Sequence, residues 1–301
     1  MITKLEQLIG AVQQRQKRTR LVVAYAQDKH SMEAAVAAQR LGIIDPILVG
    51  NRIQINQIAE EIGADLSSFI IQEEKDDVSS VARAVQMIHN GEADVLMKGL
   101  VSTDKYMKGI LNKETGLVPP KATLSHIAVL EIPAYDKLLL VTDVAILVQP
   151  SLSQKITQVT YLRNVAHSFG IEVPKIAILS ATEQVLHNIP SCYDAAIIAT
   201  MGRRNQIPGC IIDGPLALDV AINKESVRIK HLDSPVGGEA DGLVFPTLES
   251  ANIFFKGATN FMGAKIAGMV YGAKVPCVLT SRGDTPESKL YSIALAALTA
   301  K

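Results

Sequence analysis

A serine and an arginine stand side by side between a predicted strand and a predicted helix near residue 280. The apolar run 276–280 predicts the strand, and Ser281 and Arg282 follow it. A guanidinium carries paired donors, and a helix N-terminus offers free N–H groups, so both could hold a phosphate or a similar anion. This segment therefore predicts an anion site. The alternative is a surface turn in which Arg282 pairs with Asp284 or Glu287.

A second segment of the same kind follows the apolar run 95–97. Lys98 ends that predicted strand, and a predicted helix begins near Asp104. Lys98, Ser102 and Thr103 could therefore face a ligand at the end of the strand. Ordinary capping of the helix by Ser102 or Thr103 explains the hydroxyl residues equally well.

Two further predicted strands end in polar residues, with Asp213 after one and Asn252 a few residues after the other. Helix capping accounts for both residues adequately. Four polar strand ends in one chain nevertheless favour a cleft that is lined from two domains, although they do not name a reaction.

Short apolar runs that alternate with helical patterns place these residues. Strands separated by helices of this length are typical of parallel sheets built from β-α-β units, so the sequence predicts an α/β fold. The helix after residue 285 is the best defined, because Thr285 is a suitable N-cap and Pro286 suits the first helical position. The predicted helices are 32–41, 78–89, 104–111, 153–169, 253–270 and 286–298.

The proline-containing stretch 117–133 joins two helix–strand blocks, so we place the first domain edge near residue 133. With 301 residues, two domains are the natural expectation. The polar stretch 223–238 is predicted to be a solvated connection, with a lid over a ligand as the alternative.

Composition excludes several classes of function. The formal net charge is zero and tryptophan is absent, so neither a nucleic-acid surface nor an anionic-membrane surface is indicated. Neither a signal peptide nor a membrane span is expected. The three cysteines are scattered and form no C-x-x-C pair, which favours buried, reduced thiols in a cytoplasmic protein over a zinc or redox site.

Common enzyme fingerprints are also missing from the sequence. It holds no G-x-G-x-x-G and no G-x-x-x-x-G-K-[ST], which argues against the usual dinucleotide site and the Walker phosphate loop. It likewise holds no H-E-x-x-H and no G-x-S-x-G. None of these absences is decisive alone.

Several stretches together resemble the phosphate acetyl/butyryltransferases, and within them the butyryl, or branched-chain acyl, branch. The likeness covers nearly the whole chain with order and spacing preserved. The matching stretches begin at Met97 (MKGLVST), Leu124 (LSHI), Val141 (VTDVA, with Pro150 after it), Asp213 (DGPLALD), Gly238 (GEADGLVFP), Asn252 (NI) and Thr280 (TSRGD).

This resemblance implies a two-domain α/β protein like the isocitrate and isopropylmalate dehydrogenases, with parallel-rich sheets flanked by helices and an active site in the interdomain cleft. The first domain would combine residues 1–133 with 275–301, and the second would hold 134–274. The implied reaction interconverts acyl-CoA plus phosphate with acyl phosphate plus CoA, in short-chain fatty acid metabolism. Coenzyme A would be a substrate, with no tightly bound cofactor and no metal, and the protein would be a homodimer or a higher homo-oligomer.

By resemblance, Ser281 and Arg282 hold the phosphate or the acyl oxygen near the sulfur of CoA. Acetyl-specific members carry an aspartate seven positions after the serine, proposed as the base for the CoA thiol. Ser288 stands there in this sequence, which mildly favours the butyryl branch. The base is then Asp284 or Glu287, and the two alternatives stay open.

Lys98, Ser102, Thr103 and Ser125 are predicted to complete the phosphate pocket, and Asn252 is a further predicted ligand-binding residue. Direct transfer in a ternary complex is the more economical mechanism. Its competitor is a covalent acyl-enzyme.

Three other functions remain as alternatives. One is a phosphate acetyltransferase with the same chemistry. Another is a metal-dependent dehydrogenase of the same architecture, with the metal held by Asp213, Asp219 and Asp241. The last is a non-catalytic regulator that binds CoA without turnover.

Overall fold

The computed structural model describes residues 1–15, 18–281 and 283–300. The chain divides into two compact units. The terminal unit joins Leu5–Leu124 to Ile266–Lys301, and the central unit joins Met1–Lys4 to Ser125–Lys265. Division into domains near residues 133 and 275 stays a prediction. Over the described ranges, every helix is too short or too polar to cross a membrane.

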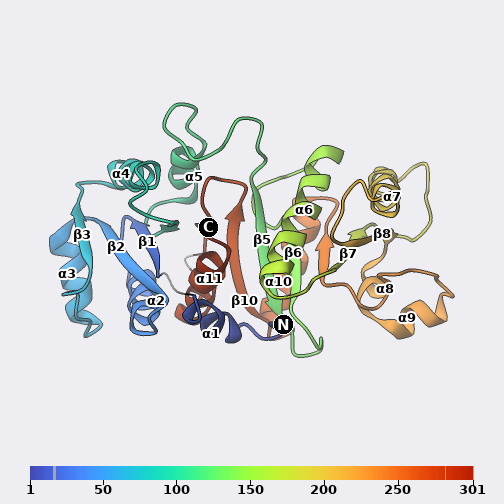
Figure 1. The fold of residues 1–301 in the computed structure, drawn as a ribbon, viewed down its shortest axis with the longest axis horizontal. Coiled ribbons are helices and arrows are strands. Elements are labelled where there is room, and N and C mark those ends of the chain that lie inside the picture. Colours follow the sequence, from blue (N-terminus) through green and yellow to red (C-terminus); the bar gives the residue numbers. More distant parts are fainter. Residues whose placement is uncertain (16–17, 282, 301) are drawn as a thin grey trace. The chain divides into compact units, whose positions relative to one another are not determined.

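The strands of the terminal unit run in the order β3-β2-β1-β4-β11-β10, of which Figure 1 labels β3, β2, β1 and β10. Neighbours are parallel along this order as far as β11, and β10 is antiparallel to β11. The predicted α/β class with parallel-rich sheets is therefore confirmed. The strands are β1 (Thr19–Ala24), β2 (Ile44–Gly50), β3 (Ile70–Glu73), β4 (Val95–Lys98), β10 (Lys265–Tyr271) and β11 (Cys277–Val278).

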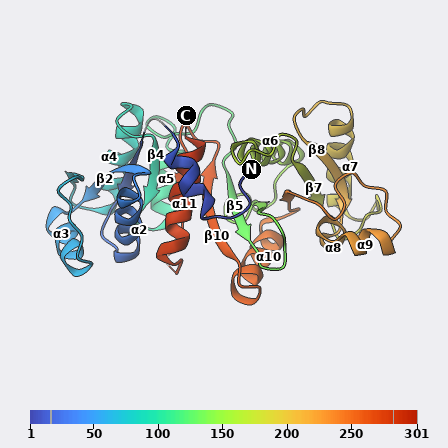
Figure 2. The same ribbon diagram turned by 60° about the horizontal axis from the view of Figure 1, so that its bottom comes forward.

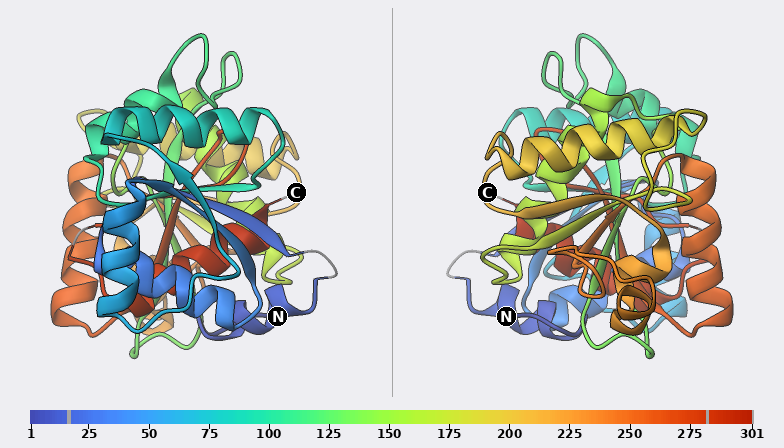
Figure 3. Two further views of the ribbon diagram at one scale, coloured as in Figure 1. Left: turned by 90° about the vertical axis from the view of Figure 1, so that its left-hand side faces the viewer. Right: turned by 90° about the vertical axis from the view of Figure 1, so that its right-hand side faces the viewer.

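Helices cover both faces of this sheet. Figure 3 shows α4 on one side of the strands and α2 and α11 on the other, and α1 lies beside α11 (Figure 2). The sequence sets these faces: in α4, Val81, Ala84, Val85 and Ile88 are buried at helical spacing. The helices are α1 (Gln7–Gln13), α2 (Lys29–Arg40), α3 (Arg52–Glu61), α4 (Asp77–His89), α5 (Thr103–Leu111) and α11 (Pro286–Thr299).

The strands of the central unit run in the order β5-β6-β9-β7-β8. Only the β5–β6 pair within this order is antiparallel. Its strands are β5 (Ser125–Glu131), β6 (Leu139–Thr142), β7 (Lys175–Leu179), β8 (Ile211–Leu216) and β9 (Gly242–Val244). Its helices are α6 (Leu152–Ser168), α7 (Pro190–Arg203), α8 (Leu218–Ile222), α9 (Lys224–Ile229) and α10 (Leu248–Phe261).

The single helix predicted at 253–270 is wrong in its second half. Helix α10 ends at Phe261, and Gly263 follows with a φ of +66°, a conformation that glycine adopts without strain. Strand β10 then begins at Lys265. Because 253–270 is apolar at mixed spacings, its composition alone did not reveal the break.

Two predicted connections also contain regular structure. The stretch 117–133 holds β5, which is buried along most of its length. Its flanking prolines and polar residues concealed the strand. The stretch 223–238 holds the short helix α9, whose N-cap is Asn223.

Candidate active site

The two segments with predicted anion-binding residues follow neighbouring strands. Strand β11 pairs with β4, so that Cys277 lies opposite Leu96 and Val278 opposite Met97. On the other side of β4, Ala24 of β1 lies opposite Lys98. Because all three strands are parallel, the residues that follow them meet at one edge of the sheet. The structure therefore brings the Lys98 segment and the Ser281 segment to the same edge of the sheet.

The turn that leads into α11 is fixed by short polar contacts. Thr285 caps the helix, since its hydroxyl accepts the backbone N–H of Ser288 at 3.2 Å, and Pro286 is the first helical residue. The carboxylate of Asp284 accepts the N–H of Ser281 at 2.7 Å. The cap and helix start are confirmed, and Ser281 is exposed. Arg282, the predicted partner of Ser281, lies outside the described residues.

The two candidate bases differ in what they already do. Asp284 holds the backbone of Ser281 and thereby shapes the turn. Glu287 is exposed in the first turn of α11, where its carboxylate accepts the hydroxyl of Tyr291 at 2.8 Å. Asp284 is therefore part of the framework of the turn, whereas Glu287 projects from the start of the helix.

Lys98 is buried at the end of β4. Its ammonium donates to the carbonyl oxygens of Gly99 and Val101, each at 3.2 Å. Gly99 is required by the close approach of the loop after β1, because a Cβ at this position would lie 2.2 Å from the carbonyl oxygen of Tyr25. The backbone N–H of Gly99 donates to the carbonyl of Ala24 at 2.9 Å, and this bond holds the segment after Lys98 against β1.

Ser102 and Thr103 lie at the start of α5. Ser102 is the N-cap, and its hydroxyl accepts the N–H of Lys105 at 3.4 Å. Thr103 is the first residue of the helix and is exposed. The capping interpretation of Ser102 is thus confirmed. A part for either hydroxyl in phosphate binding stays a prediction.

Sequence reasoning missed Lys289, which lies directly beneath the Ser281 turn. Its side chain is only 3% exposed, and its ammonium donates to the hydroxyl of Thr280 and the carbonyl of Ser281, both at 3.1 Å. Burial lowers the pKa of Lys289, and the charges of Asp28 and Asp284 offset part of that effect. Helical spacing held the signal, because position 289 continues the buried stripe of α11.

Ser125 belongs to a polar network inside the central unit. Its hydroxyl donates to the carboxylate of Asp143 at 2.9 Å and is 2.8 Å from the hydroxyl of Thr142. Ser125 is completely buried. Asn252, the fifth residue of α10, donates to the carbonyl of Val144 at 3.0 Å. Both predicted residues therefore brace the segment that follows β6, and their contact with a ligand stays a prediction.

Two of the three aspartates of the dehydrogenase alternative, Asp219 and Asp241, have other partners. Asp241 accepts from the ammonium of Lys137 at 2.6 Å and from the backbone N–H of Lys175 at 2.7 Å. Asp219 pairs with Lys230 at 3.0 Å. Across the described part of the chain, the acids, histidines and cysteines form no group of three that could hold a metal ion.

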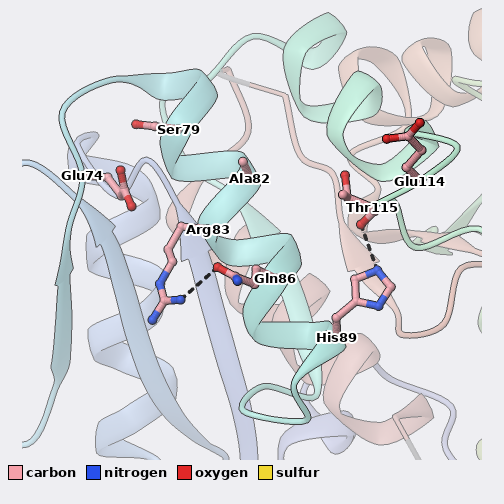
Figure 4. A pocket seen from close by; sticks show the side chains of 8 residues that line it. All are labelled: Glu74, Ser79, Ala82, Arg83, Gln86, His89, Glu114 and Thr115. Atoms are coloured by element: carbon pink, nitrogen blue, oxygen red, sulfur yellow. Dashed lines mark hydrogen bonds between the residues drawn. The ribbon is translucent and has the colours of Figure 1, made fainter.

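A hollow of about 570 Å³ lies beside α4 (Figure 4). In Figure 4, Arg83 reaches Gln86, and His89 reaches the Thr115 backbone, so these polar groups are engaged with one another. None of the predicted site residues lines this hollow. Its lining consists of Glu74, Ser79, Ala82, Arg83, Gln86, His89, Glu114 and Thr115.

Comparison with known proteins yields one family over nearly the whole chain. Residues 4–83 and 76–297 match the family described as Phosphate acetyl/butaryl transferase. The chain is 42% identical over 300 residues to a phosphate butyryltransferase of Clostridium acetobutylicum, covering 100% of this chain and 99% of the relative. It is 39% identical over 297 residues to a phosphate acetyltransferase of Thermotoga maritima, covering 98% and 99%.

The fold agrees with this assignment. The crystal structure of a branched-chain phosphotransacylase from Enterococcus faecalis V583 superimposes with a TM-score of 0.81 at 30% identity. The superposition covers 93% of this chain and 98% of that one. The chain therefore belongs to the family of phosphate acetyl- and butyryltransferases.

Proposed function

We propose that this protein is an acyltransferase that interconverts a short-chain acyl-CoA plus phosphate with an acyl phosphate plus CoA. Its preferred acyl group is butyryl or a branched-chain group of similar size. The observation that carries the proposal is the Ser281 turn at the start of α11, beside the end of β4. This arrangement supports anion binding, and it occurs in a chain that is related along its full length to a phosphate butyryltransferase.

The chemistry requires charge stabilisation in both directions. A phosphate oxygen attacks the thioester carbonyl, a C–O bond forms, the C–S bond breaks, and the departing sulfur takes up a proton. In reverse, the CoA thiol loses a proton, its sulfur attacks the carbonyl of the acyl phosphate, and phosphate leaves. Negative charge develops on the carbonyl oxygen in each case, and Arg282 with the N-terminus of α11 stabilises it.

Glu287 is the better candidate for the base. A thiol with a pKa of about 8.5 is mostly protonated at neutral pH, so a carboxylate must accept its proton. The carboxylate of Asp284 is engaged with the N–H of Ser281 and shapes the turn, so it is less free to reach the thiol of CoA. Glu287 is exposed beside the same turn. Ser281 then orients the phosphate or the thiol.

The covalent route through a cysteine is disfavoured. Cys277 is completely buried in β11, and burial raises the pKa of its thiol to about 12. Burial also raises the pKa of Cys210, although the nearby Arg163 lowers it somewhat. Neither thiol is therefore primed to form the thiolate that attacks an acyl group, which favours direct transfer between bound CoA and phosphate.

Free CoA is expected to appear from butyryl-CoA or isobutyryl-CoA only when inorganic phosphate is present, as measured with a thiol reagent across a panel of acyl-CoAs. Each methylene contributes only about 0.8 kcal/mol when buried, so the preference should change gradually along the panel. Arsenate-free buffer without phosphate serves as the blank.

The outcomes of this panel separate the alternatives. A maximum at acetyl-CoA would keep the chemistry and overturn the butyryl assignment. CoA binding without release would favour a regulator. Reduction of a nicotinamide cofactor in place of release would favour the dehydrogenase.

A homodimer is the second part of the proposal. Helix α10 buries only Ala251 and Ala258 within the chain, while Ile253 is 71% and Phe261 is 91% exposed. Such an apolar helix face is typical of a protein–protein interface. Two further statements stay predictions, namely that the protein holds no tightly bound cofactor and that it is cytoplasmic.

Light scattering after size exclusion is expected to give twice the mass of one chain for the wild type. Phe261→Lys should shift this toward the monomer, because it places a charge in the apolar face. Ile53→Lys, an equivalent change at an exposed residue of α3, is the matched control and should leave the mass unchanged. A monomeric wild type would contradict the proposal.

A further inference from the structure

Lys289 is a buried cation beneath the site, and it forms no ion pair with any residue that the structure describes. Its side chain is 3% exposed, whereas Ser281, directly above it, is exposed. Its ammonium donates to the hydroxyl of Thr280 and to the carbonyl of Ser281, each at 3.1 Å. Buried lysines are rare unless they are paired, so this one calls for an explanation beyond packing.

Two acids influence Lys289 without reaching it. Asp28, in the loop after β1, and Asp284, in the turn before α11, both favour its charged form. Within the described ranges, neither lies within ion-pair distance of the ammonium. One carboxylate oxygen of Asp28 accepts the N–H of Ser31 at 2.9 Å, and the other is buried with no hydrogen-bond partner among the described residues. The positive charge is thus only partly compensated.

The backbone of Ser281 is held from both sides. Its N–H donates to Asp284 at 2.7 Å, and its carbonyl accepts from Lys289 at 3.1 Å. The hydroxyl of Ser281 is left at the exposed side of the turn, where it accepts the N–H of Gly283 at a long 3.4 Å. A dianion that binds at this turn would meet both a fixed serine and a positive charge in a low-dielectric surrounding, where attraction is strong.

We propose that Lys289 is a positioning residue for phosphate, which fixes the backbone of Ser281 and supplies the buried positive charge that an anion at this turn requires. The inference rests on the proposed function, because it assumes that phosphate binds at the Ser281 turn. Lys289 acts through Thr280 and Ser281 and takes no part in bond making.

The experiment measures KM for inorganic phosphate with butyryl-CoA held saturating. Lys289→Met, which keeps the length of the side chain and removes the charge, is expected to raise this KM about tenfold or more, because the positive charge and the hydrogen bond to the carbonyl of Ser281 are both lost. KM for butyryl-CoA should change little. Lys289→Arg restores the charge and should recover part of the loss. Lys108→Met, at an exposed lysine of α5, is the control.

Asp28→Asn is expected to change KM for phosphate in the opposite direction from Lys289→Met. The amide oxygen can still accept the N–H of Ser31, but the negative charge near Lys289 is lost, so KM for phosphate is expected to fall. A purely structural lysine would not produce changes in opposite directions. This variant also keeps the inference testable if Lys289→Met does not fold.

Thermal unfolding with added inorganic phosphate separates this inference from the proposed function. Phosphate should raise the melting temperature of the wild type, and less so that of Lys289→Met. If the wild type released no CoA but phosphate still raised its melting temperature, the proposed function would be overturned and the anion site would stand. Normal release by Lys289→Met with an unchanged KM for phosphate would overturn the inference, as would a loss of stability alone.

Discussion

Changing Arg282 to alanine is expected to lower kcat for phosphate-dependent CoA release by about 100- to 1000-fold, the usual cost of removing a donor to a developing oxyanion. The melting temperature should stay near that of the wild type, because the flanking Ser281 and Gly283 are exposed. Steady-state kinetics and thermal unfolding of the same preparation test both statements.

Two further variants test whether the loss of kcat is specific to the guanidinium of Arg282. Arg282→Lys keeps the charge and loses the paired donors, so its kcat should lie between those of the wild type and the alanine variant. Arg228→Ala removes an exposed arginine that pairs with Glu225 in α9, and should be without effect. Near-normal kcat for Arg282→Ala would remove this residue from the mechanism.

Glu287→Gln is expected to lower the rate of acyl phosphate plus CoA by about 100-fold or more at neutral pH, because general-base catalysis contributes at least that much. The loss should shrink as the pH rises toward about 8.5, where the CoA thiol ionises without help. A pH–rate profile of both enzymes from pH 6 to 9 measures the effect.

Asp284→Asn is the matched comparison for the base. The amide oxygen of asparagine can still accept the N–H of Ser281, so the turn should persist and the rate should fall only slightly. If Asp284→Asn shows the larger, pH-dependent loss and Glu287→Gln does not, then Asp284 is the base.

The sequence predicted those parts of the fold whose signals are local. Strand β4 is a short apolar run, and the start of α11 is marked by a capping residue with a proline after it. Strand β5 was missed because prolines and polar residues flank it, and strand β10 was missed because its apolar residues follow closely on those of α10. The break after α10 depends on one glycine conformation that no periodicity records.

The candidate site could be predicted only in part for a similar reason. Ser281 and Lys98 stand out because they follow strands, and parallel pairing brings such residues to one edge. Lys289 did not stand out, because a lysine in an amphipathic helix ordinarily faces solvent. Helical spacing places position 289 on the buried face of α11, but spacing does not distinguish a buried lysine from one whose ammonium reaches solvent. For Ser125, sequence spacing likewise did not show that its hydroxyl donates to Asp143 inside the central unit.

The order of the strands in the terminal unit bears on how the protein is made. Strand β11 lies between β4 and β10, yet it is synthesised after the whole central unit. A nascent chain therefore carries β1 to β4 with the edge of β4 unpaired while the ribosome completes more than a hundred further residues, Ser125–Lys265 among them. Unpaired strand edges associate readily with other chains. Translation through the central unit is thus the interval in which this protein most needs protection by chaperones.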